Sequence, residues 1–174
     1  MTIRKILIEP NKLLRQISNP VEKVGDEERR LMDDMLDTMY AAPGIGLAAI
    51  QVGVPKKVIV MDISKKEGEK LPMHFVNPEI ISKSNINSVY EEGCLSVPGQ
   101  FAEIARPKKC KIQFLDYNGH PQEIEAEGMF ATCIQHEIDH LEGILFIDYL
   151  SKLKKTMIVK KLSKQKKEIE RIIV

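Results

Sequence analysis

The sequence predicts an α+β fold, in which short antiparallel or mixed strands form small sheets around a central helix, with a further helix near each end of the chain. Helical periodicity occupies residues 26–40, β-branched runs fill the middle of the chain, and helical spacing returns at residue 129. The chain has 174 residues, of which 43% are hydrophobic and 29% are charged. These values are typical of one globular domain and too apolar for a disordered chain.

The first helix is expected from Asp26 to Tyr40, with Asp26 as its N-terminal cap. The spacing of its apolar residues places them on one face. That face consists of Leu31, Met32, Met35, Leu36 and Met39. The helix should end before the sequence AAPGIG, because Pro43 and the two glycines after it break helical structure.

Short strands are expected between the helices. The strand-like runs are LAAIQVG, KVIVMDI, HFVNPEIIS and SVYEEGCLSVPG, and the last of them leads into a turn. The segment KCKIQFLDYNGHPQEIEAEG predicts a hairpin, because Asn118-Gly119 between two alternating runs is a strong turn signal.

Helical spacing returns at Met129. Met129, Cys133, His136 and His140 are separated by four, three and four residues, so they share one helix face. Gly143 is expected to end this helix, because glycine readily adopts the left-handed conformation found after a helix C-terminus.

Charge divides the chain into an acidic body, residues 1–150, and a basic tail, residues 151–174. The tail holds eight Lys and one Arg against two Glu, a net charge of +7, whereas residues 1–150 hold 17 basic and 23 acidic residues. A helix is expected to begin at about Asp148 or Ser151 and to pack on the body or extend from it. Its apolar stripe comprises Leu150, Leu153, Met157, Ile158 and Leu162.

Several protein classes are excluded by composition. No apolar run approaches the ~18 residues needed to cross a bilayer. The start of the chain, MTIRKILIEP, resembles neither a signal peptide nor a transit peptide, so we expect a cytoplasmic protein. The three cysteines, Cys94, Cys110 and Cys133, are an odd number, which argues against a disulfide framework. Cys110 lies in an alternating run and is expected in the core.

The segment CIQHEIDHLEG contains a candidate metal site. His136 and His140 lie at positions i and i+4 of the expected helix, where two imidazoles can share one ion, and Glu137 can handle protons beside them. The flanking residues are apolar, so these polar groups would be costly to bury unless a metal satisfied them. A catalytic centre of this type needs three protein ligands and one open position.

The third ligand decides which chemistry is expected. One class of zinc peptidase uses a His six residues after the second His, where this chain has Phe146. Another uses a downstream Glu, but Glu168 and Glu170 lie among the lysines of the tail. Cys133 would lie in line with the histidines, which is poor for a tetrahedron. Cys94 arrives from a separate strand and is favoured, because a thiolate is a strong donor to a borderline divalent ion.

Three motifs together resemble those of the peptide deformylases. Gly44–Gln51 reads GIGLAAIQ and matches the family pattern Gly-x-Gly-x-Ala-Ala-x-Gln. Glu92–Ser96 reads EGCLS and matches Glu-Gly-Cys-x-Ser, and Gln135–His140 reads QHEIDH and matches Gln-His-Glu-x-Asp-His. All three motifs are complete and in order, and the wider likeness extends to about residue 150.

The resemblance implies a metal-dependent hydrolase that removes the N-formyl group from the N-terminal formylmethionine of newly synthesised polypeptides and releases formate. Cys94, His136 and His140 would hold one divalent ion, which makes the expected central helix a metal-binding helix. The resemblance favours Fe²⁺, and Zn²⁺, Ni²⁺ or Co²⁺ also suit a ligand set of two nitrogens and one sulfur.

The resemblance also assigns roles around the ion. Glu137 would take a proton from the attacking water and deliver it to the departing nitrogen. The side-chain amide of Gln51 and the backbone N–H of Leu95 would stabilise the oxyanion. The ion itself would activate the water and polarise the formyl oxygen.

Two kinds of substrate contact are expected, one with backbone and one with apolar side chains. Gly44, Ile45 and Gly46 would offer backbone to an extended peptide, and the alternative is an ordinary glycine turn after the first helix. Ile45, Met129 and Cys133 would form an apolar slot for the methionine side chain, or are plain core.

Supporting residues and partners complete the expectations. Asp139, Gln135 and Glu92 are expected to support the ligands or to pack the helix. The resemblance favours docking of the basic tail on the ribosome near the peptide exit, and the alternative is a solvated helix packed on the body. No membrane and no specific nucleic-acid sequence are expected. The rival functions are a metallopeptidase that cuts internal bonds and an inactive ribosome-binding protein.

Overall fold

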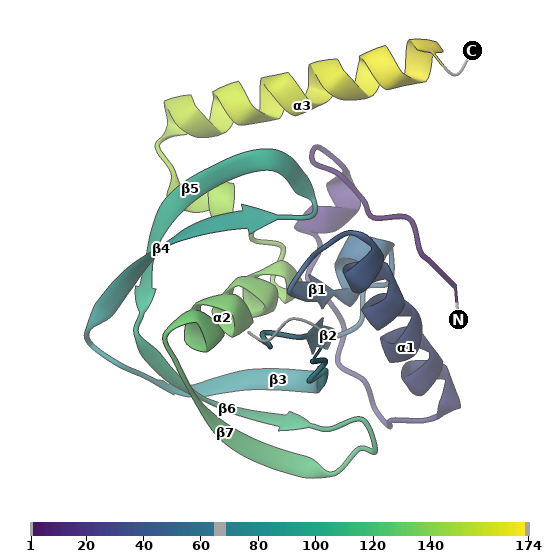
Figure 1. The fold of residues 1–174 in the computed structure, drawn as a ribbon, viewed down its shortest axis with the longest axis vertical. Helices are drawn as coiled ribbons and strands as arrows, with labels where there is room; N and C mark the ends of the chain where they lie inside the picture. The colour runs from purple at the N-terminus through teal and green to yellow at the C-terminus, as the bar shows by residue number, and fades with distance from the viewer. Residues whose placement is uncertain (1, 65–68, 173–174) are drawn as a thin grey trace.

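A computed structural model describes residues 2–64 and 69–172 of the chain (Figure 1). The α-helices are α1 (Asp26–Ala41), α2 (Met129–Leu141) and α3 (Lys152–Ile172). Short 3₁₀ helices occupy Lys12–Arg15, Ala49–Val52 and Phe146–Tyr149. The strands are β1 (Gly46–Ala48), β2 (Val58–Met61), β3 (Met73–Lys83), β4 (Asn87–Cys94), β5 (Val97–Pro107), β6 (Lys109–Leu115) and β7 (Pro121–Glu127).

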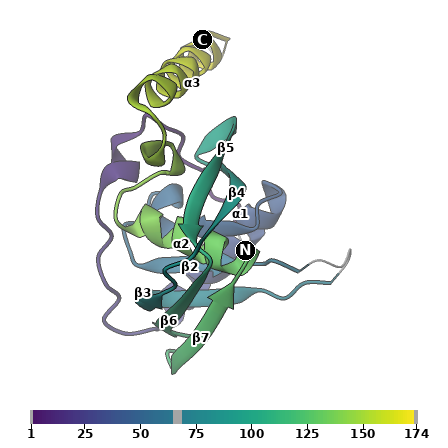
Figure 2. The same cartoon turned by 90° about the vertical axis from the view of Figure 1, so that its left-hand side faces the viewer.

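The strands form two sheets, and α2 lies between them (Figures 1 and 2). One sheet has the order β1-β2-β3-β6-β7, and the other pairs β4 with β5. Every strand pair among the described residues is antiparallel. The predicted α+β class, with small sheets around a central helix and a helix near each end, is confirmed, and its strands are antiparallel rather than mixed.

Strand β2 lies at the centre of the packing because both of its faces are buried. Val58 and Val60 contact the core that α1 closes, which also contains Met32, Met35 and Met39. Ile59 and Met61 point to the opposite face and join the core under α2, with Phe75, Ile112 and Ile134. Alternate residues of a strand point to opposite faces, so a strand buried on both faces appears in the sequence as an unbroken apolar run.

The hairpin and the end of α2 agree with their sequence signals. Strands β6 and β7 pair along their length across the Asn118-Gly119 turn, and Gly119 has a φ of 82°. Gly143 follows α2 with a φ of 72°, as expected for a glycine after a helix C-terminus. Cys110 is buried in the core, as predicted.

Three local expectations were wrong. The N-cap of α1 is Gly25, whose N–H donates to the Glu28 carboxylate at 3.0 Å, and Asp26 is the first helical residue. The run LAAIQVG is strand only to Ala48 and then turns into the Ala49–Val52 3₁₀ helix, because the Gln51 carboxamide accepts the Ala48 N–H. Strand β5, which starts inside an expected turn, runs on to Pro107.

Helix α3 lies along the outside of the body and packs through a narrower face than predicted (Figure 1). Leu162 is 2% exposed and packs in a cluster with Leu145, Phe146 and Ile147. Leu153 and Met157 belong to the predicted stripe but are 71% and 62% exposed. At about 100° per residue, Leu153 lies roughly 180° around the helix from Leu162. No helix in the described part of the chain has the length and apolar character needed to cross a membrane.

Replacing Leu162 by Ala should loosen α3, because it empties a fully buried site and typically costs about 2–5 kcal/mol. We expect lower stability in urea titration and faster proteolysis within α3. Leu153→Ala is the matched control and should change the unfolding free energy by no more than about 0.5 kcal/mol. Equal effects of the two substitutions would contradict the assigned packing face.

Candidate active site and metal centre

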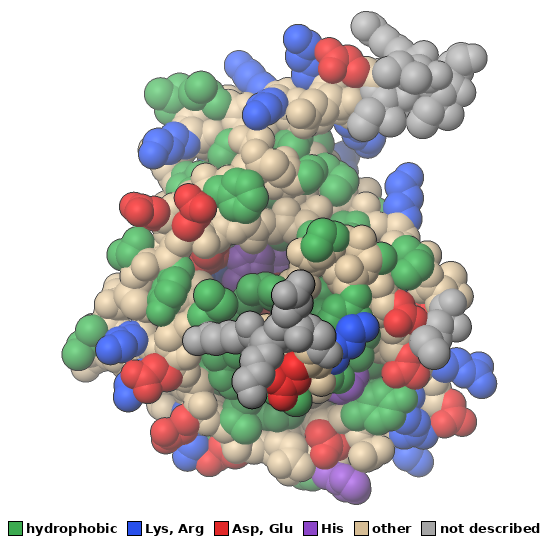
Figure 3. All heavy atoms as spheres, viewed as in Figure 1, with side chains coloured by type: hydrophobic (Ala, Val, Ile, Leu, Met, Phe, Trp, Pro, Cys, Tyr) green, Lys and Arg blue, Asp and Glu red, His purple; other side chains and the backbone are tan. Residues whose placement is uncertain are grey.

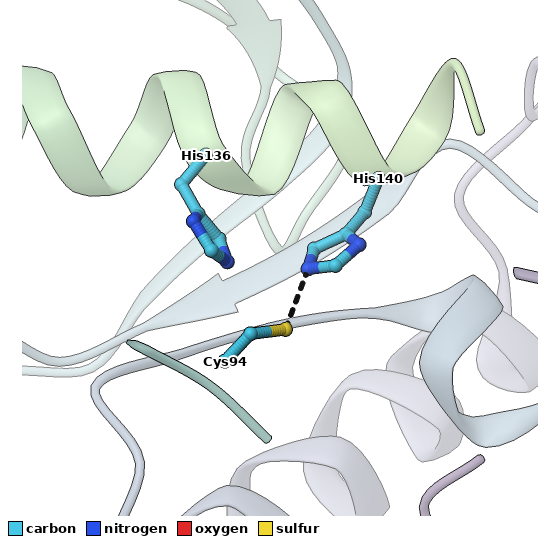
Figure 4. A group of neighbouring side chains, drawn as sticks. All are labelled: Cys94, His136 and His140. Atoms are coloured by element: carbon cyan, nitrogen blue, oxygen red, sulfur yellow. Dashed lines mark hydrogen bonds between the residues drawn. The ribbon is translucent and has the colours of Figure 1, made fainter. Parts of the chain in front are cut away.

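Helix α2 and the end of β4 bring Cys94, His136 and His140 together, as the sequence predicted (Figure 4). The two histidines project from the same face of α2, and Cys94 approaches from the opposite side. The Cys94 sulfur lies 3.2 Å from Nε2 of His140, and the three donor atoms lie within 4.8 Å of one another. This is the one such cluster of His, Cys, Asp and Glu in residues 2–64 and 69–172.

The donor set fits a divalent metal ion. A thiolate and two imidazole nitrogens suit borderline ions such as Zn²⁺ and Fe²⁺, and an ion with bonds of about 2.0–2.3 Å can draw the three donors together. Burial holds the pKa of His140 well below its usual value, which favours the neutral ring that a metal ligand needs. Three ligands leave one coordination position for a water or a substrate oxygen.

A buried ion-pair network fixes the orientation of His136. Its Nδ1 lies 2.8 Å from Oε2 of Glu92, which leaves Nε2 to face Cys94 and His140. Arg106 binds the same Glu92 carboxylate through Nε and Nη2 and reaches Asp139 at 2.7 Å through Nη1. Tyr149 donates its hydroxyl hydrogen to Asp139 at 2.8 Å. A carboxylate behind a ligating histidine sets its tautomer and ring orientation.

Arg106 makes this network possible, and the sequence did not reveal it. The residue is 4% exposed although it is charged, and it lies on β5, the strand whose extent was missed. Burial acts to raise the pKa of Glu92, but the hydrogen bonds from His136 and Arg106 outweigh it and hold that pKa below its usual value. Reading QFAEIARP as a strand would have placed Arg106 on the same face as Ile104, because alternate residues of a strand share a face.

Glu137 lies beside the proposed metal ligands, in the same cavity as His136 and Cys94. Its carboxylate is buried, and Oε2 has no hydrogen-bond partner among the described residues. Burial raises the pKa of Glu137 to about 7, which is near the value that suits a general base at neutral pH. A Cβ at Gly46 would collide with this carboxylate, so only glycine lets β1 pass so close.

Gln51 and Leu95 flank Cys94. The Gln51 carbonyl oxygen accepts the Ala48 N–H at 2.8 Å, which directs the amide nitrogen towards Ser96 at 3.1 Å and the Cys94 sulfur at 3.6 Å. Gln51 therefore presents N–H donors next to the metal ligands. Leu95 lies in the turn between β4 and β5 and borders the same cavity.

A cavity of about 460 Å³ opens beside these groups. In Figure 3 it is the hollow in the centre of the face, with histidine at its base and apolar side chains around it. All of the expected substrate residues line it: Gly44, Ile45, Gly46, Met129 and Cys133. Burial and the nearby Glu137 raise the pKa of Cys133 to about 12, so it remains a neutral thiol. Tyr90 and Phe101 also line the cavity and were not anticipated.

The two downstream positions considered for the third ligand do not join the cluster. Phe146 is buried in the cluster under α3, and Glu168 lies on α3 with its side chain 57% exposed. Gln135, expected as a supporting residue, donates to the Pro107 and Ala131 carbonyls and so ties α2 to the end of β5.

Comparisons with known proteins agree with this geometry. The family model for polypeptide deformylase matches residues 3–156. The peptide deformylase of Pelagibacter ubique is 72% identical over 174 residues, with all of both chains covered, and that of Phenylobacterium zucineum is 60% identical, covering 96% of this chain and 99% of the relative. A crystal structure of peptide deformylase from Ehrlichia chaffeensis is 42% identical with a TM-score of 0.90, covering 95% of this chain and 97% of that one.

The match extends along the whole chain rather than over isolated motifs, and the relatives share both the sequence and the fold. The cluster of Cys94, His136 and His140 also has the donor chemistry of a metallohydrolase. The chain therefore belongs to the polypeptide deformylase family, enzymes that remove the N-formyl group from newly made polypeptides.

Proposed function

We propose that this chain hydrolyses the N-formyl group of N-formyl-methionyl peptides at the cavity beside α2, with Glu137 as the proton-transfer residue. One observation carries the proposal: the three-ligand cluster, the buried carboxylate of Glu137 and the oriented amide of Gln51 meet at one cavity. Family membership gives the reaction, and these residues are the parts of the chain that perform it.

The substrate binds along β1. This strand is at the edge of its sheet and pairs with β2 on one side, so its other side can take an extended peptide by backbone hydrogen bonds. Gly44 and Gly46 carry no side chains, which lets the backbone here lie close to Leu95 and Glu137. The methionine side chain enters the apolar part of the cavity, between Ile45 and the α2 residues Met129 and Cys133.

Cys94, His136 and His140 hold one divalent ion, for which we propose Fe²⁺. When bound, such an ion acts as a Lewis acid that activates water and polarises the formyl carbonyl. Glu137 accepts the proton of the attacking water and delivers it to the departing amine nitrogen. Gln51 donates its amide N–H, and Leu95 its backbone N–H, to the oxygen on which negative charge develops. The ion pair of Glu92 with Arg106 keeps His136 in its ligating orientation.

Formate release from formyl-Met-Ala-Ser by protein purified without oxygen tests the proposal. The wild-type protein should release formate, and Glu137→Gln should lower kcat by about 10²–10⁴, since general acid–base catalysis contributes that much. Gln has nearly the same shape as Glu, so the close contact with Gly46 is kept and the metal content should not change. Absence of formate from an iron-loaded wild-type preparation would reject the function.

Metal analysis of two cysteine variants tests the ligand set. Cys94→Ala removes a proposed ligand and should reduce metal affinity by more than the ~10–100-fold typical of residues that only orient ligands. Cys133→Ala changes a cysteine in the same cavity and should keep one ion per chain. The metal found in the wild-type protein tests the choice of Fe²⁺. A full metal complement in Cys94→Ala would restore the rival hypothesis of a metallopeptidase.

Residues 1–150 are the catalytic unit in this proposal, and the basic tail 151–174, which contains α3, docks on the ribosome in the cytoplasm. Support comes from the exposed positions of Lys152, Lys160 and Lys164 on α3. Deleting the tail would be a poor test, because Leu162 packs against the body. Substituting exposed lysines leaves that contact intact.

The triple variant Lys152→Gln, Lys160→Gln and Lys164→Gln should bind ribosomes more weakly. Each lost phosphate contact should reduce the slope of log affinity against log salt by about 0.7–0.9. The matched control replaces Lys108, Lys109 and Lys111, which lie on or beside β6, by Gln with the same change in charge. Sedimentation with ribosomes at several salt concentrations measures both variants. Equal losses would show that binding depends on net charge alone and would reject docking through α3.

A further inference from the structure

A groove of about 750 Å³ separates β5 from α3, outside the site described above. Its floor is residues 100–103 of β5. Its wall is one face of α3, formed by Lys154, Met157, Ile158 and Lys161. Successive offsets of three, one and three residues keep these four side chains within a sector of about 100° on the helix.

The floor of the groove is the edge of a strand. Four consecutive residues border the groove, so both faces of the strand contribute to it, as expected where a strand is approached along its edge. Residues 101–103 pair with β4 on one side, and within the described residues β5 has no strand on its other side. The backbone groups along that side can therefore receive an extended peptide as an added strand.

Two large apolar side chains border the groove while remaining open to solvent. Phe101 is 66% exposed and Met157 is 62% exposed, although each lies beside other apolar residues. An apolar groove that follows a free strand edge is suited to an unfolded segment with apolar side chains, because backbone hydrogen bonds give affinity and the pockets bind alternate side chains.

The groove continues from the active-site cavity. Pro98 and Gly99 line the cavity, residues 100–103 line the groove, and Phe101 borders both. Strand β5 therefore passes directly from one to the other. At about 3.3 Å per residue, the run from 100 to 103 is matched by roughly four residues of an extended peptide.

We infer that this groove binds the part of the formylated polypeptide that follows the residues held in the active-site cavity. The inference rests on the proposed deformylase function and names a second subsite for the same substrate. The subsite takes about four extended residues and favours apolar side chains over polar ones. Short formyl peptides end before the groove and do not use it.

Three formylated peptides test the subsite. One is formyl-Met-Ala-Ser, and two extend it to ten residues, with either Val, Ile and Leu or only Gly and Ser in the added part. The wild-type protein should show a kcat/KM about three- to tenfold higher for the apolar ten-residue peptide than for its Gly/Ser counterpart, as expected when one or two methylene groups of an added side chain are buried.

Met157→Asp should reduce that ratio to about one without changing turnover of formyl-Met-Ala-Ser. Leu153→Asp is the matched control, since it places the same charge on an exposed leucine of α3 outside the groove. It should preserve the wild-type ratio. No preference in the wild-type protein, or the same preference in Met157→Asp, would overturn the inference.

Two further outcomes are informative. If no formyl peptide is hydrolysed, the proposed function fails, and the subsite is judged instead by fluorescence polarisation with the labelled apolar ten-residue peptide. Binding that is equal in the wild-type protein and Met157→Asp would then reject it. A dimer in sedimentation that dissociates on Met157→Asp would show that the groove is an interface between two copies of this chain, which would also overturn the inference.

Discussion

The burial of His136, Glu137 and His140 on neighbouring turns of α2 is the constraint on which the rest of the structure depends. Ionisable groups are costly to bury in an apolar interior unless they have partners. Strand β4 supplies Glu92 behind His136 and Cys94 in front of it, and β5 supplies Arg106 to balance Glu92 and Asp139. The two-stranded sheet therefore supplies the charged and polar partners of α2, whereas the five-stranded sheet packs against its apolar side chains.

Much of the site and of the fold could be predicted, because the signals for them lie in the spacing of residues close together in the sequence. The i, i+4 placement of His136 and His140, the cysteine outside that helix, and the Asn118-Gly119 turn are signals within short stretches of sequence. The contributions that escaped prediction come from long-range packing. Arg106 is an ordinary exposed charge in a single-sequence analysis, until β5 is paired against β4 and its side chain faces inward.

Helix α3 shows the reverse case, in which residues predicted to pack against the body are exposed. Its composition predicted a helix correctly. The amphipathic pattern does not show, however, how many of the apolar residues will be buried against the body. The body contacts α3 around Leu162, so Leu153 and Met157 remain exposed on the far and lateral faces. The apolar residues left over are then available to a surface groove rather than to the core.

Strand β2 belongs to two hydrophobic cores, which couples the unfolding of one to that of the other. Val58 and Val60 belong to the core closed by α1, and Ile59 and Met61 belong to the core closed by α2, so four adjacent residues are shared by both layers. Neither layer can separate from β2 without exposing the other, which favours a single cooperative transition. An ion bound on α2 would then stabilise the distant α1 layer by mass action, since ligand binding to the native state raises the free energy of the whole transition.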